Sequence, residues 1–245
     1  MANAEGSLAR RDAGGMTARY AVYYAPDQGS RLWEKASAWL GRDAYTGAVV
    51  NRPDIPALEG LDVDALTSDP RGYGFHATLK APFELAAEVS EGELLAFAAD
   101  FVRTQASFTA AIEPGRIGLF HALRLAEISP GMSALHEACV KAFDRFRAPL
   151  SDQDLARRRR AKLTEDQDSK LVAWGYPYIF DEFRFHMTLT GTIRDDAVSA
   201  RVGAVLMDQF GEDAGAHLFD ALAIFRQPDR ESPFDIIARL AFEAA

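Results

Sequence analysis

Two short stretches of the sequence, FHATLK and FHMTLT, each place a histidine and a threonine two positions apart. The first contains His76 and Thr78, and the second, 110 positions later, contains His186 and Thr188. In a β-strand this spacing directs both side chains to one face. Because imidazole titrates near neutral pH, one histidine can act as a general base toward water while the other acts as a general acid toward a leaving group.

The polar faces of these two strands also carry cations and no carboxylate. Lys80 shares a face with the first pair, and Arg184 and Thr190 share a face with the second, so all three are candidates to bind a substrate. For one copy alone, an ordinary amphipathic strand facing solvent would be the simpler interpretation. Two matching copies favour a shared site for an anion, in which Lys80 and Arg184 supply positive charge, although each could instead be a strand-edge charge that reaches solvent.

The elements that would position the two pairs occur in the same order in both halves of the chain. Each half contains a motif strand, a helix and two strands, according to apolar periodicity and turn residues. The predicted ranges are 73–80, 90–105, 108–120 and 121–129 in the first half, and 183–193, 194–211, 217–229 and 234–242 in the second. Pro114 and Gly115 indicate a turn or bulge inside 108–120.

Further elements precede and separate the two halves. The pattern predicts a strand at 19–26, helices at 30–41, 132–146 and 163–177, and an irregular segment at 42–72. We therefore predict an α+β fold, duplicated and two-lobed, with two antiparallel sheets facing a central cleft and helices on the outside.

The domain prediction follows from this order. We expect a disordered tail at 1–15, a single domain at 16–245, lobes at roughly 16–130 and 164–245, and a basic connecting segment at 147–163. The tail lacks the apolar core of a signal peptide, and either Met1 or Met16 could be the start. No stretch of about 18 apolar residues could span a membrane.

Composition narrows the range of partners. The chain has 245 residues, and 36 acidic against 27 basic residues give a net charge of −9. This charge argues against broad binding to duplex DNA, but a small anion in a locally basic cleft, or a short RNA, stays open. The run ARRRRAK at 156–162 is interpreted first as a solvated loop or helix face, with contact to a polyanion as the alternative.

The sequence offers few ligands for a metal ion. Cys139 is the single cysteine, so a disulfide framework and a thiolate zinc site are both excluded. No carboxylate lies beside the motif histidines, which falls short of the usual three or four protein ligands. We expect no metal and no cofactor, and a cytoplasmic protein whose oligomeric state the sequence leaves open.

The paired H-x-T pattern resembles the 2H phosphoesterase superfamily, which includes RNA 2′,3′-cyclic phosphodiesterases and 2′-5′ RNA ligase-type proteins. The strings RYAVYYAP, WLGRD, YGFHATLKAPF, WGYPY and FRFHMTLTG are more closely similar to a branch associated with phosphonate-utilisation operons. The resemblance implies that His76 and His186 are the catalytic pair and that Thr78 and Thr188 bind the phosphate. Hydroxyl groups suit that role because they donate hydrogen bonds to phosphoryl oxygens.

Aromatic residues beside the motifs are further candidates. Tyr73, Tyr176 and Tyr178 precede the motif strands, where they could stack on a ribose or base, although packing is the more common role of such tyrosines. Tyr23 and Arg42 are indicated only by the resemblance. The other histidines lack the following threonine and are interpreted as surface or core residues.

The sequence thus predicts a metal-independent phosphoesterase that hydrolyses a small cyclic or diester phosphate, in a setting that the resemblance associates with phosphonate metabolism. Cleavage of an RNA or nucleotide 2′,3′-cyclic phosphate is the alternative within the same class. A non-catalytic protein that binds a phosphorylated metabolite or nucleotide is the alternative from a different class.

Overall fold

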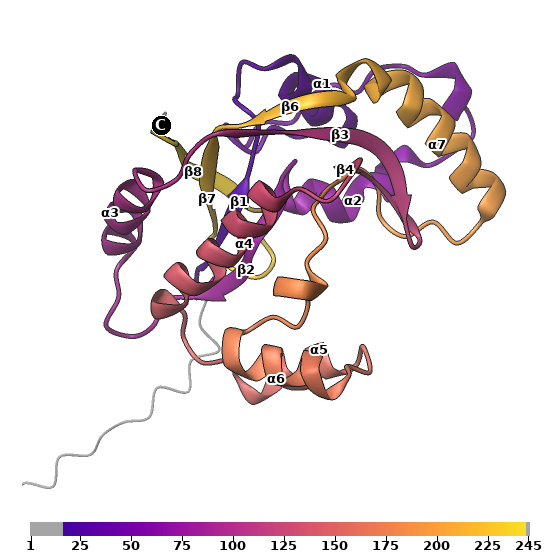
Figure 1. Ribbon diagram of the computed structural model, residues 1–245. Coiled ribbons are helices and arrows are strands. Elements are labelled where there is room, and N and C mark those ends of the chain that lie inside the picture. Colours follow the sequence, from indigo (N-terminus) through magenta and orange to yellow (C-terminus); the bar gives the residue numbers. More distant parts are fainter. Residues whose placement is uncertain (1–16, 244–245) are drawn as a thin grey trace, which may run out of the picture.

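A computed structural model describes residues 17–243, so the predictions for the N-terminal tail and for Met16 lie outside the described part (Figure 1). The strands are β1 (Arg19–Tyr24), β2 (Ala77–Glu84), β3 (Phe108–Ile117), β4 (Phe120–Leu125), β5 (His186–Thr188), β6 (Gly215–Phe219), β7 (Ala221–Gln227) and β8 (Asp235–Ala241). The α-helices are α1 (Arg31–Leu40), α2 (Val63–Tyr73), α3 (Glu91–Val102), α4 (Pro130–Phe143), α5 (Asp152–Arg159), α6 (Glu165–Trp174) and α7 (Asp196–Phe210). The predicted α+β class is confirmed.

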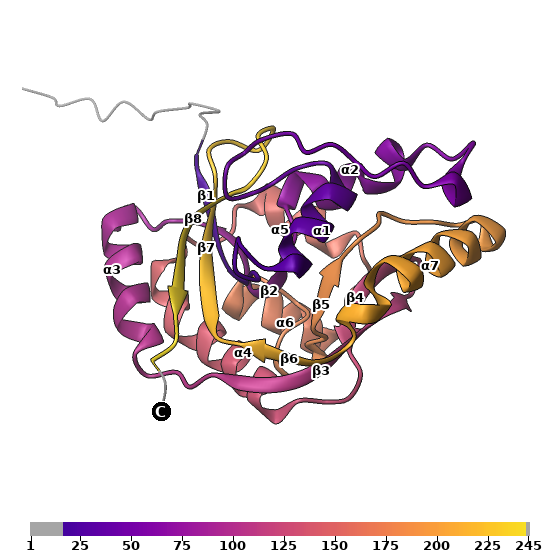
Figure 2. The ribbon, with the colours of Figure 1, turned by 90° about the horizontal axis from the view of Figure 1, so that it is seen from above.

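The strands form one curled antiparallel sheet in the order β6-β3-β4-β5-β2-β1-β7-β8. Figure 2 shows β7 and β8 running across the direction of β3 and β6. The two halves of the sheet meet only where β2 pairs with β5, through Ala77 and Met187. The two sheets expected from the sequence are therefore the halves of one sheet, and the motif strands form its centre.

The halves of the sheet do not coincide with the two halves of the chain. One half of the sheet contains β2, β1, β7 and β8, in which β1 pairs with β7, and the other half contains β6, β3, β4 and β5. Each half of the sheet therefore combines strands from both predicted lobes. Periodicity locates strands but says nothing about their partners, because pairing is decided by contacts between residues far apart in the chain.

Most helices begin and end where local signals predict. Ser30 accepts a hydrogen bond from the Trp33 N–H at the start of α1, and Gly41 ends that helix with a left-handed φ of 82°. Thr164 and Gln167 form the predicted capping box of α6. These caps satisfy backbone groups that a helix leaves without partners at its ends.

Helix α2 lies in the segment that the sequence predicted to be irregular. Pro70 is inside this helix and has no N–H to donate to the carbonyl of Leu66. The Leu66 carbonyl instead accepts a 2.7 Å hydrogen bond from the N–H of Gly191, just after the second motif. The proline that argued against a helix thus leaves a carbonyl that ties α2 to the second motif.

Two strand predictions were wrong in detail. The segment 217–229 divides at Asp220 into β6 and β7, which pair with opposite halves of the sheet. Pro114 and Gly115 lie inside β3 in an uninterrupted register with β4, so neither a turn nor a bulge occurs there. The chain turns after β3 at Gly118, which has a φ of 56°.

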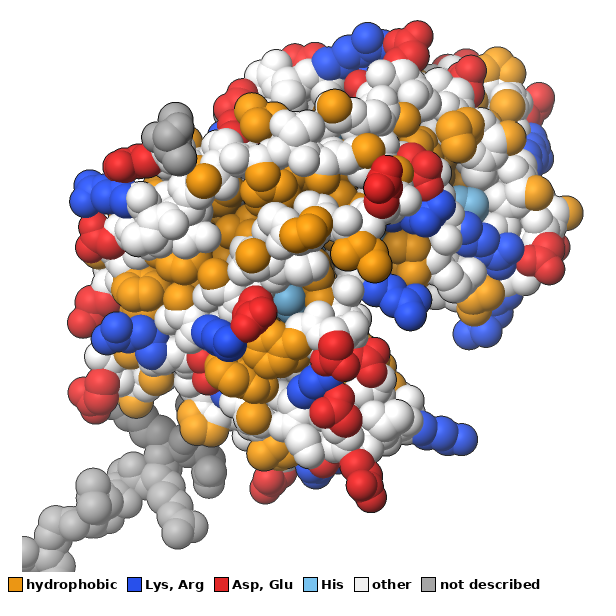
Figure 3. Space-filling view, viewed as in Figure 1, with side chains coloured by type: hydrophobic (Ala, Val, Ile, Leu, Met, Phe, Trp, Pro, Cys, Tyr) orange, Lys and Arg blue, Asp and Glu red, His pale blue; other side chains and the backbone are white. Residues whose placement is uncertain are grey.

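The charges on the surface and the helices of the described chain bear on its predicted partners. On the face shown in Figure 3, Lys and Arg side chains are interspersed with Asp and Glu and form no broad basic surface. Within residues 17–243, no helix is both long enough and apolar enough to cross a membrane.

Candidate active site

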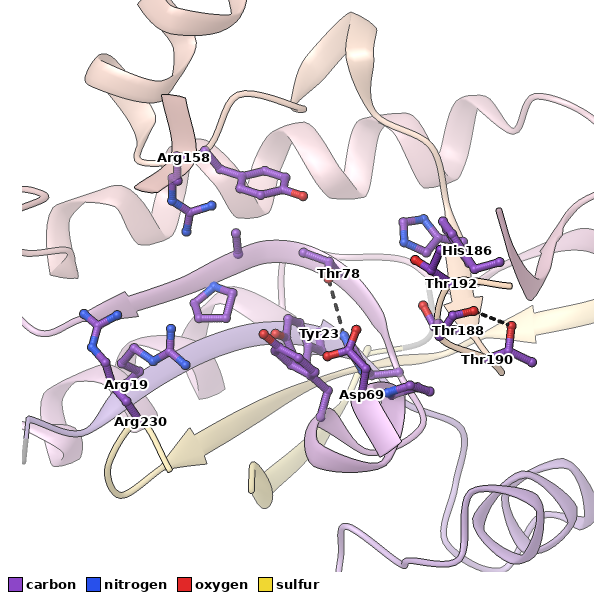
Figure 4. Close-up of a pocket in the computed structure, with 18 of the residues that line it drawn as sticks. Arg19, Tyr23, Asp69, Thr78, Arg158, His186, Thr188, Thr190, Thr192 and Arg230 are labelled. Carbon is purple, nitrogen blue, oxygen red and sulfur yellow. Dashed lines mark hydrogen bonds between the residues drawn. The ribbon is translucent and has the colours of Figure 1, made fainter. Parts of the chain in front are cut away.

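The two motif strands are neighbours, and their polar residues line one cleft of about 700 Å³. Because the pairing is antiparallel and Ala77 is opposite Met187, the register sets His76 beside Thr188 and Thr78 beside His186. All four side chains line the cleft, which Figure 4 shows in close-up. The structure thus brings together the four residues predicted to be catalytic.

Both histidines are held in the same way by the backbone. Nδ1 of His76 is 2.9 Å from the carbonyl oxygen of Gly74, and Nδ1 of His186 is 2.7 Å from the carbonyl oxygen of Arg184. A carbonyl oxygen only accepts, so each Nδ1 must carry the proton. In the neutral form of each ring, Nε2 is therefore the unprotonated nitrogen, able to accept a proton from a ligand in the cleft.

The surroundings of His76 favour its neutral form. The Tyr23 ring stacks on the imidazole with centroids 3.9 Å apart and an interplanar angle of 21°. Burial lowers the pKa of His76 to about 4, with the nearby His186 as a smaller contribution in the same direction. Burial also lowers the pKa of His186, whose ring centroid lies 5.5 Å from that of Phe120. Both rings are therefore neutral at pH 7 when the cleft holds no anion.

The hydroxyl groups of the two motifs have different surroundings. Thr78 Oγ1 lies 3.4 Å from His76 Nε2, at the long end of the hydrogen-bond range. Thr188 also lines the cleft, on the neighbouring strand. Thr190 is buried: its Oγ1 accepts from the N–H of His121 at 2.9 Å and donates to the carbonyl of Gly191 at 3.0 Å. We therefore interpret Thr190, predicted to bind substrate, as a residue that fixes the backbone at the cleft wall.

β5 has only three residues, so its own strand ladder is short. Hydrogen bonds to other elements hold the backbone that follows it. The carbonyl of Leu189 accepts from Trp39 Nε1 at 2.8 Å, and the N–H of Leu189 donates to the His121 carbonyl at 2.9 Å. Together with the bond from Gly191 to Leu66, these contacts replace a longer strand ladder. They hold the second motif against helices α1 and α2.

Lys80 lies outside the cleft, and its predicted role is corrected. β2 shows register shifts against β1: Thr78 is opposite Tyr23, but Lys80 is opposite Val22. Such a β-bulge adds a residue and turns the next side chain to the other face of the sheet. Lys80 is buried there and donates to Asp144 at 2.9 Å and to the Val140 carbonyl at 3.2 Å. Lys80 thus links β2 to α4 and to Asp144, which follows that helix.

Arg184 is also placed away from the cleft. Its exposed side chain borders a separate depression that includes Arg116, Arg124 and Phe183. Arg184 precedes β5 in a loop, so the alternation of a strand does not apply to it. Its connection to the site is its backbone carbonyl, which accepts the hydrogen bond from His186.

The predicted tyrosines separate into two groups. Tyr73 and Tyr176 line the cleft, and Tyr73 also stacks on Phe234 with centroids 5.3 Å apart. Tyr178 does not line the cleft, is 39% exposed, and packs edge-on against Tyr176 at 5.6 Å. Two tyrosines thus remain candidates for contact with a sugar or base.

The cleft also contains residues that the sequence did not predict. The guanidinium groups of Arg19, Arg157, Arg158 and Arg230 line it, and so does Tyr23, which only the resemblance had indicated. The basic run was interpreted first as a solvated face, but two of its residues, Arg157 and Arg158, belong to α5 and line the cleft. Arg19 could have been found, because alternation in β1 places it on the same face as Tyr23.

One carboxylate lines the cleft, that of Asp69 in α2, so the expectation of a carboxylate-free cleft was wrong. In the part of the chain that the structure describes, no three His, Cys, Asp or Glu side chains gather in a way that could hold a metal ion. The side chains of the cleft are suited to proton transfer by the imidazoles, hydrogen bonding by the hydroxyls and anion binding by the guanidinium groups.

The fold and the cleft define an α+β protein with two H-x-T strands paired at its centre. The chain belongs to the family described as "Protein of unknown function (DUF1045)", whose model matches residues 78–235, well over half of its length. The predicted similarity to a branch associated with phosphonate-utilisation operons agrees with the name PhnN that two curated relatives carry.

Two curated relatives carry the name "Ribose 1,5-bisphosphate phosphokinase PhnN". The one from Janthinobacterium sp. (strain Marseille) is 36% identical over 91% of this chain and 51% of its own length. The one from Laribacter hongkongensis (strain HLHK9) is 33% identical over 88% of this chain and 50% of its own length. The chain thus spans about half the length of the curated relatives it matches.

Solved structures with similar folds include two that align with most of this chain. "Crystal structure of phosphoesterase" is 12% identical, with a TM-score of 0.40 and coverage of 91% of this chain and 98% of that one. "Crystal structure of E.coli LigT complexed with ATP" is 12% identical, with a TM-score of 0.43 and coverage of 93% and 99%. These scores describe a coarse similarity of fold.

Proposed function

We propose that this protein is a phosphoesterase that hydrolyses a small cyclic or diester phosphate through the His76 and His186 pair. The observation that carries the proposal is the matched arrangement of the two imidazoles. Each is held through Nδ1 by a backbone carbonyl, each leaves Nε2 for the cleft, and each lies beside a threonine hydroxyl. Two such groups on adjacent strands suit the two proton transfers of a displacement at phosphorus.

The reaction requires one proton acceptor and one proton donor. We assign His76 as the base because its pKa, about 4, keeps it neutral when the phosphate binds. Its Nε2 accepts a proton from water as the water oxygen bonds to phosphorus. His186, protonated in the complex with the anionic substrate, donates from Nε2 to the leaving oxygen as the other P–O bond breaks. An acyclic diester gives a phosphomonoester and an alcohol, whereas a cyclic phosphate gives one molecule that carries both groups.

The threonines have a separate task. During the displacement, negative charge is spread over the non-bridging phosphoryl oxygens. Hydroxyl groups of Thr78 and Thr188 donate hydrogen bonds to these oxygens. Because the two strands are neighbours, both hydroxyls and both imidazoles reach the same phosphate group.

A small sugar phosphate is the substrate class that we favour. The curated relatives are, by name, kinases that act on ribose 1,5-bisphosphate, and this chain matches half of each. A phosphoesterase joined to such a kinase would act on a related pentose phosphate. Cleavage of a nucleoside 2′,3′-cyclic phosphate and binding without turnover are the alternative outcomes of the test.

The test uses phosphorus NMR with excess chelator on a panel of cyclic ribose phosphates and nucleoside 2′,3′-cyclic phosphates. The variants are His76→Asn and His186→Asn, because the Asn amide can still donate to the backbone carbonyl that holds Nδ1. We expect each to lose at least about 100-fold in rate. His217→Gln is the matched control, since His217 lies outside the cleft, where Nε2 is 2.6 Å from the Tyr24 hydroxyl.

The outcomes separate the alternatives. Turnover only of nucleotides would move the substrate to the nucleotide class. Ligand-induced shifts without product, in the wild type as in both Asn variants, would identify a binding protein. Full activity in either Asn variant would contradict paired-histidine catalysis.

A further inference from the structure

Four arginines from distant parts of the chain gather at the side of the cleft away from His186. Arg19 begins β1, Arg157 and Arg158 belong to α5, and Arg230 follows β7. In Figure 4, Arg19, Arg158 and Arg230 lie on one side of the space, with His186, Thr188 and Thr192 on the other. The same four arginines border an adjoining pocket of about 300 Å³. We call these four residues the arginine cluster.

The arginine cluster carries more positive charge than its carboxylates neutralise. Asp154 pairs with Arg157 at 2.6 Å and with Arg230 at 2.9 Å, and Arg230 also pairs with Glu84 at 2.8 Å. Within residues 17–243, Arg19 and Arg158 form no ion pair with a carboxylate. Four guanidinium groups against two carboxylates leave about two positive charges.

Arg158 and Arg19 are held in place without being neutralised. The guanidinium of Arg158 lies 5.1 Å from the centre of the Tyr176 ring, and its buried Nε has no hydrogen-bond partner in the described structure. Nε of Arg19 donates to the side-chain oxygen of Gln227 at 2.7 Å, and Gln227 is fixed by its own bond to the Ser232 carbonyl. Both arginines are therefore positioned by neutral groups.

The uncompensated charges of Arg19 and Arg158 lower the stability of the folded protein. Burial and the neighbouring arginines lower the pKa of Arg19, and burial is also the main cause of the lowered pKa of Arg158. Partly buried like charges with an unpartnered donor are costly unless an anion completes them. Such an anion would occupy the same cleft as the phosphate at the histidines.

We infer that the arginine cluster binds a second phosphate of the same substrate, a phosphomonoester, while the histidine pair acts on the cyclic or diester phosphate. This inference rests on the proposed function. A phosphomonoester carries a charge of about −1.5 to −2 at neutral pH, which matches the excess charge of the cluster. Arginine suits it because the planar guanidinium donates two parallel hydrogen bonds to phosphate oxygens.

A second phosphate on the substrate indicates which classes of reaction must come before and after this one. Hydrolysis of a cyclic phosphate on a sugar that already carries a phosphomonoester releases a sugar bisphosphate. The step that supplies the substrate must therefore close a phosphate ring on a phosphorylated sugar. The product class is the one that the curated relatives take by name, since ribose 1,5-bisphosphate is a pentose bisphosphate.

The experiment compares matched substrates, ribose 1,2-cyclic phosphate with and without a 5-phosphate, by initial rates of hydrolysis. The wild type should prefer the 5-phosphorylated compound by about 100-fold or more in kcat/KM. Arg158→Gln and Arg19→Gln should each reduce that preference by about 10- to 100-fold, mainly through KM. Arg160→Gln is the matched control, because Arg160 belongs to the same basic run but does not line the cleft.

A binding measurement separates failure of this inference from failure of the proposed function. By calorimetry, ribose 5-phosphate should bind the wild type and His76→Asn alike, and Arg158→Gln should bind it at least about 10-fold more weakly. Equal hydrolysis of both ribose compounds would overturn the second site and leave the phosphoesterase standing.

Two other results would also overturn the inference. One is a preference for an RNA dinucleotide ending in a 2′,3′-cyclic phosphate over the 5-phosphorylated sugar, which would assign the cluster to a phosphodiester. The other is an absence of ribose 5-phosphate binding in the wild type. If the wild type hydrolysed none of these compounds but still bound ribose 5-phosphate through the arginine cluster, only the proposed function would be contradicted.

Discussion

Single atoms decide the chemistry of the cleft. The hydrogen bonds from Nδ1 of His76 and His186 to backbone carbonyls select the same tautomer in both rings and leave Nε2 for the reaction. The two rings differ in their surroundings, since the imidazole of His76 stacks on the ring of Tyr23. The motif alone makes the two roles interchangeable, whereas the burial of His76 favours it as the base.

The lowered pKa values predict an acidic optimum for the reaction. The productive form needs one neutral and one protonated imidazole, so kcat/KM should be bell-shaped between the two pKa values of the free protein. The pKa of His76 is about 4 and that of His186 is lowered from 6.5, so the optimum should lie below pH 6.5.

The profile is best measured with a nucleoside 2′,3′-cyclic phosphate or ribose 1,2-cyclic phosphate, whichever is turned over, because a cyclic diester does not itself titrate in this range. His186→Asn should lack the alkaline limb, and His76→Asn should lack the acid limb. A rate that stays flat between pH 5 and 8 would argue against two titrating imidazoles.

Elements position these atoms, and the junction between α2 and β2 shows how. Gly74 ends α2 with a φ of 75°, and its carbonyl holds His76. A Cβ at this position would lie 2.5 Å from the Cβ of Ala44. Only glycine combines this backbone conformation with so close an approach, so the orientation of His76 depends on the end of a helix.

Gly74→Ala should therefore reduce both stability and activity. We expect a loss of about 2 kcal/mol or more in the free energy of unfolding, from backbone strain and the contact with Ala44. Activity should fall further than stability predicts because the carbonyl that orients His76 shifts. Urea unfolding and initial rates measure the two effects.

Gly60→Ala is the control for this change. Gly60 has a φ of 81°, and a Cβ there would meet no atom within 4 Å. Only the strain of the left-handed conformation should remain, about 1 kcal/mol, with activity unchanged. If Gly74→Ala behaved like Gly60→Ala in both measurements, the junction would have no special role in placing His76.

The sequence located the two H-x-T pairs better than the residues around them, for a physical reason. The H-x-T pairs share a face because strand alternation is local, and helix caps such as Ser30 and Thr164 are local as well. The prediction that Lys80 lines the cleft was wrong because a bulge in β2 breaks the alternation of side chains, and that bulge depends on pairing with β1. The arginine cluster was missed because its members come from three separate parts of the chain.

At the scale of the whole molecule, all five histidines share one electrostatic trend. Burial is the first cause that lowers the pKa of each one: His76, His121, His136, His186 and His217. In the unfolded chain each returns to about 6.5. Below that pH the unfolded state binds more protons than the folded state, so the free energy of unfolding must fall as the pH decreases.

We therefore expect stability to be highest above about pH 6.5 and to decline steadily toward pH 4, in the same range where the catalytic rate rises.

His136 tests this best because it lies outside the cleft, is 2% exposed and has a pKa of about 4. It accounts for roughly 3 kcal/mol of the decline at most. His136→Gln, which can still accept from the N–H of Phe180, should unfold in urea with a smaller difference between pH 7 and pH 4.5. An unchanged difference would mean that burial of this histidine does not control its protonation. The acidic optimum of the cleft and the neutral optimum of the fold have the same origin, because burying an imidazole both keeps a general base neutral and makes its protonation destabilising.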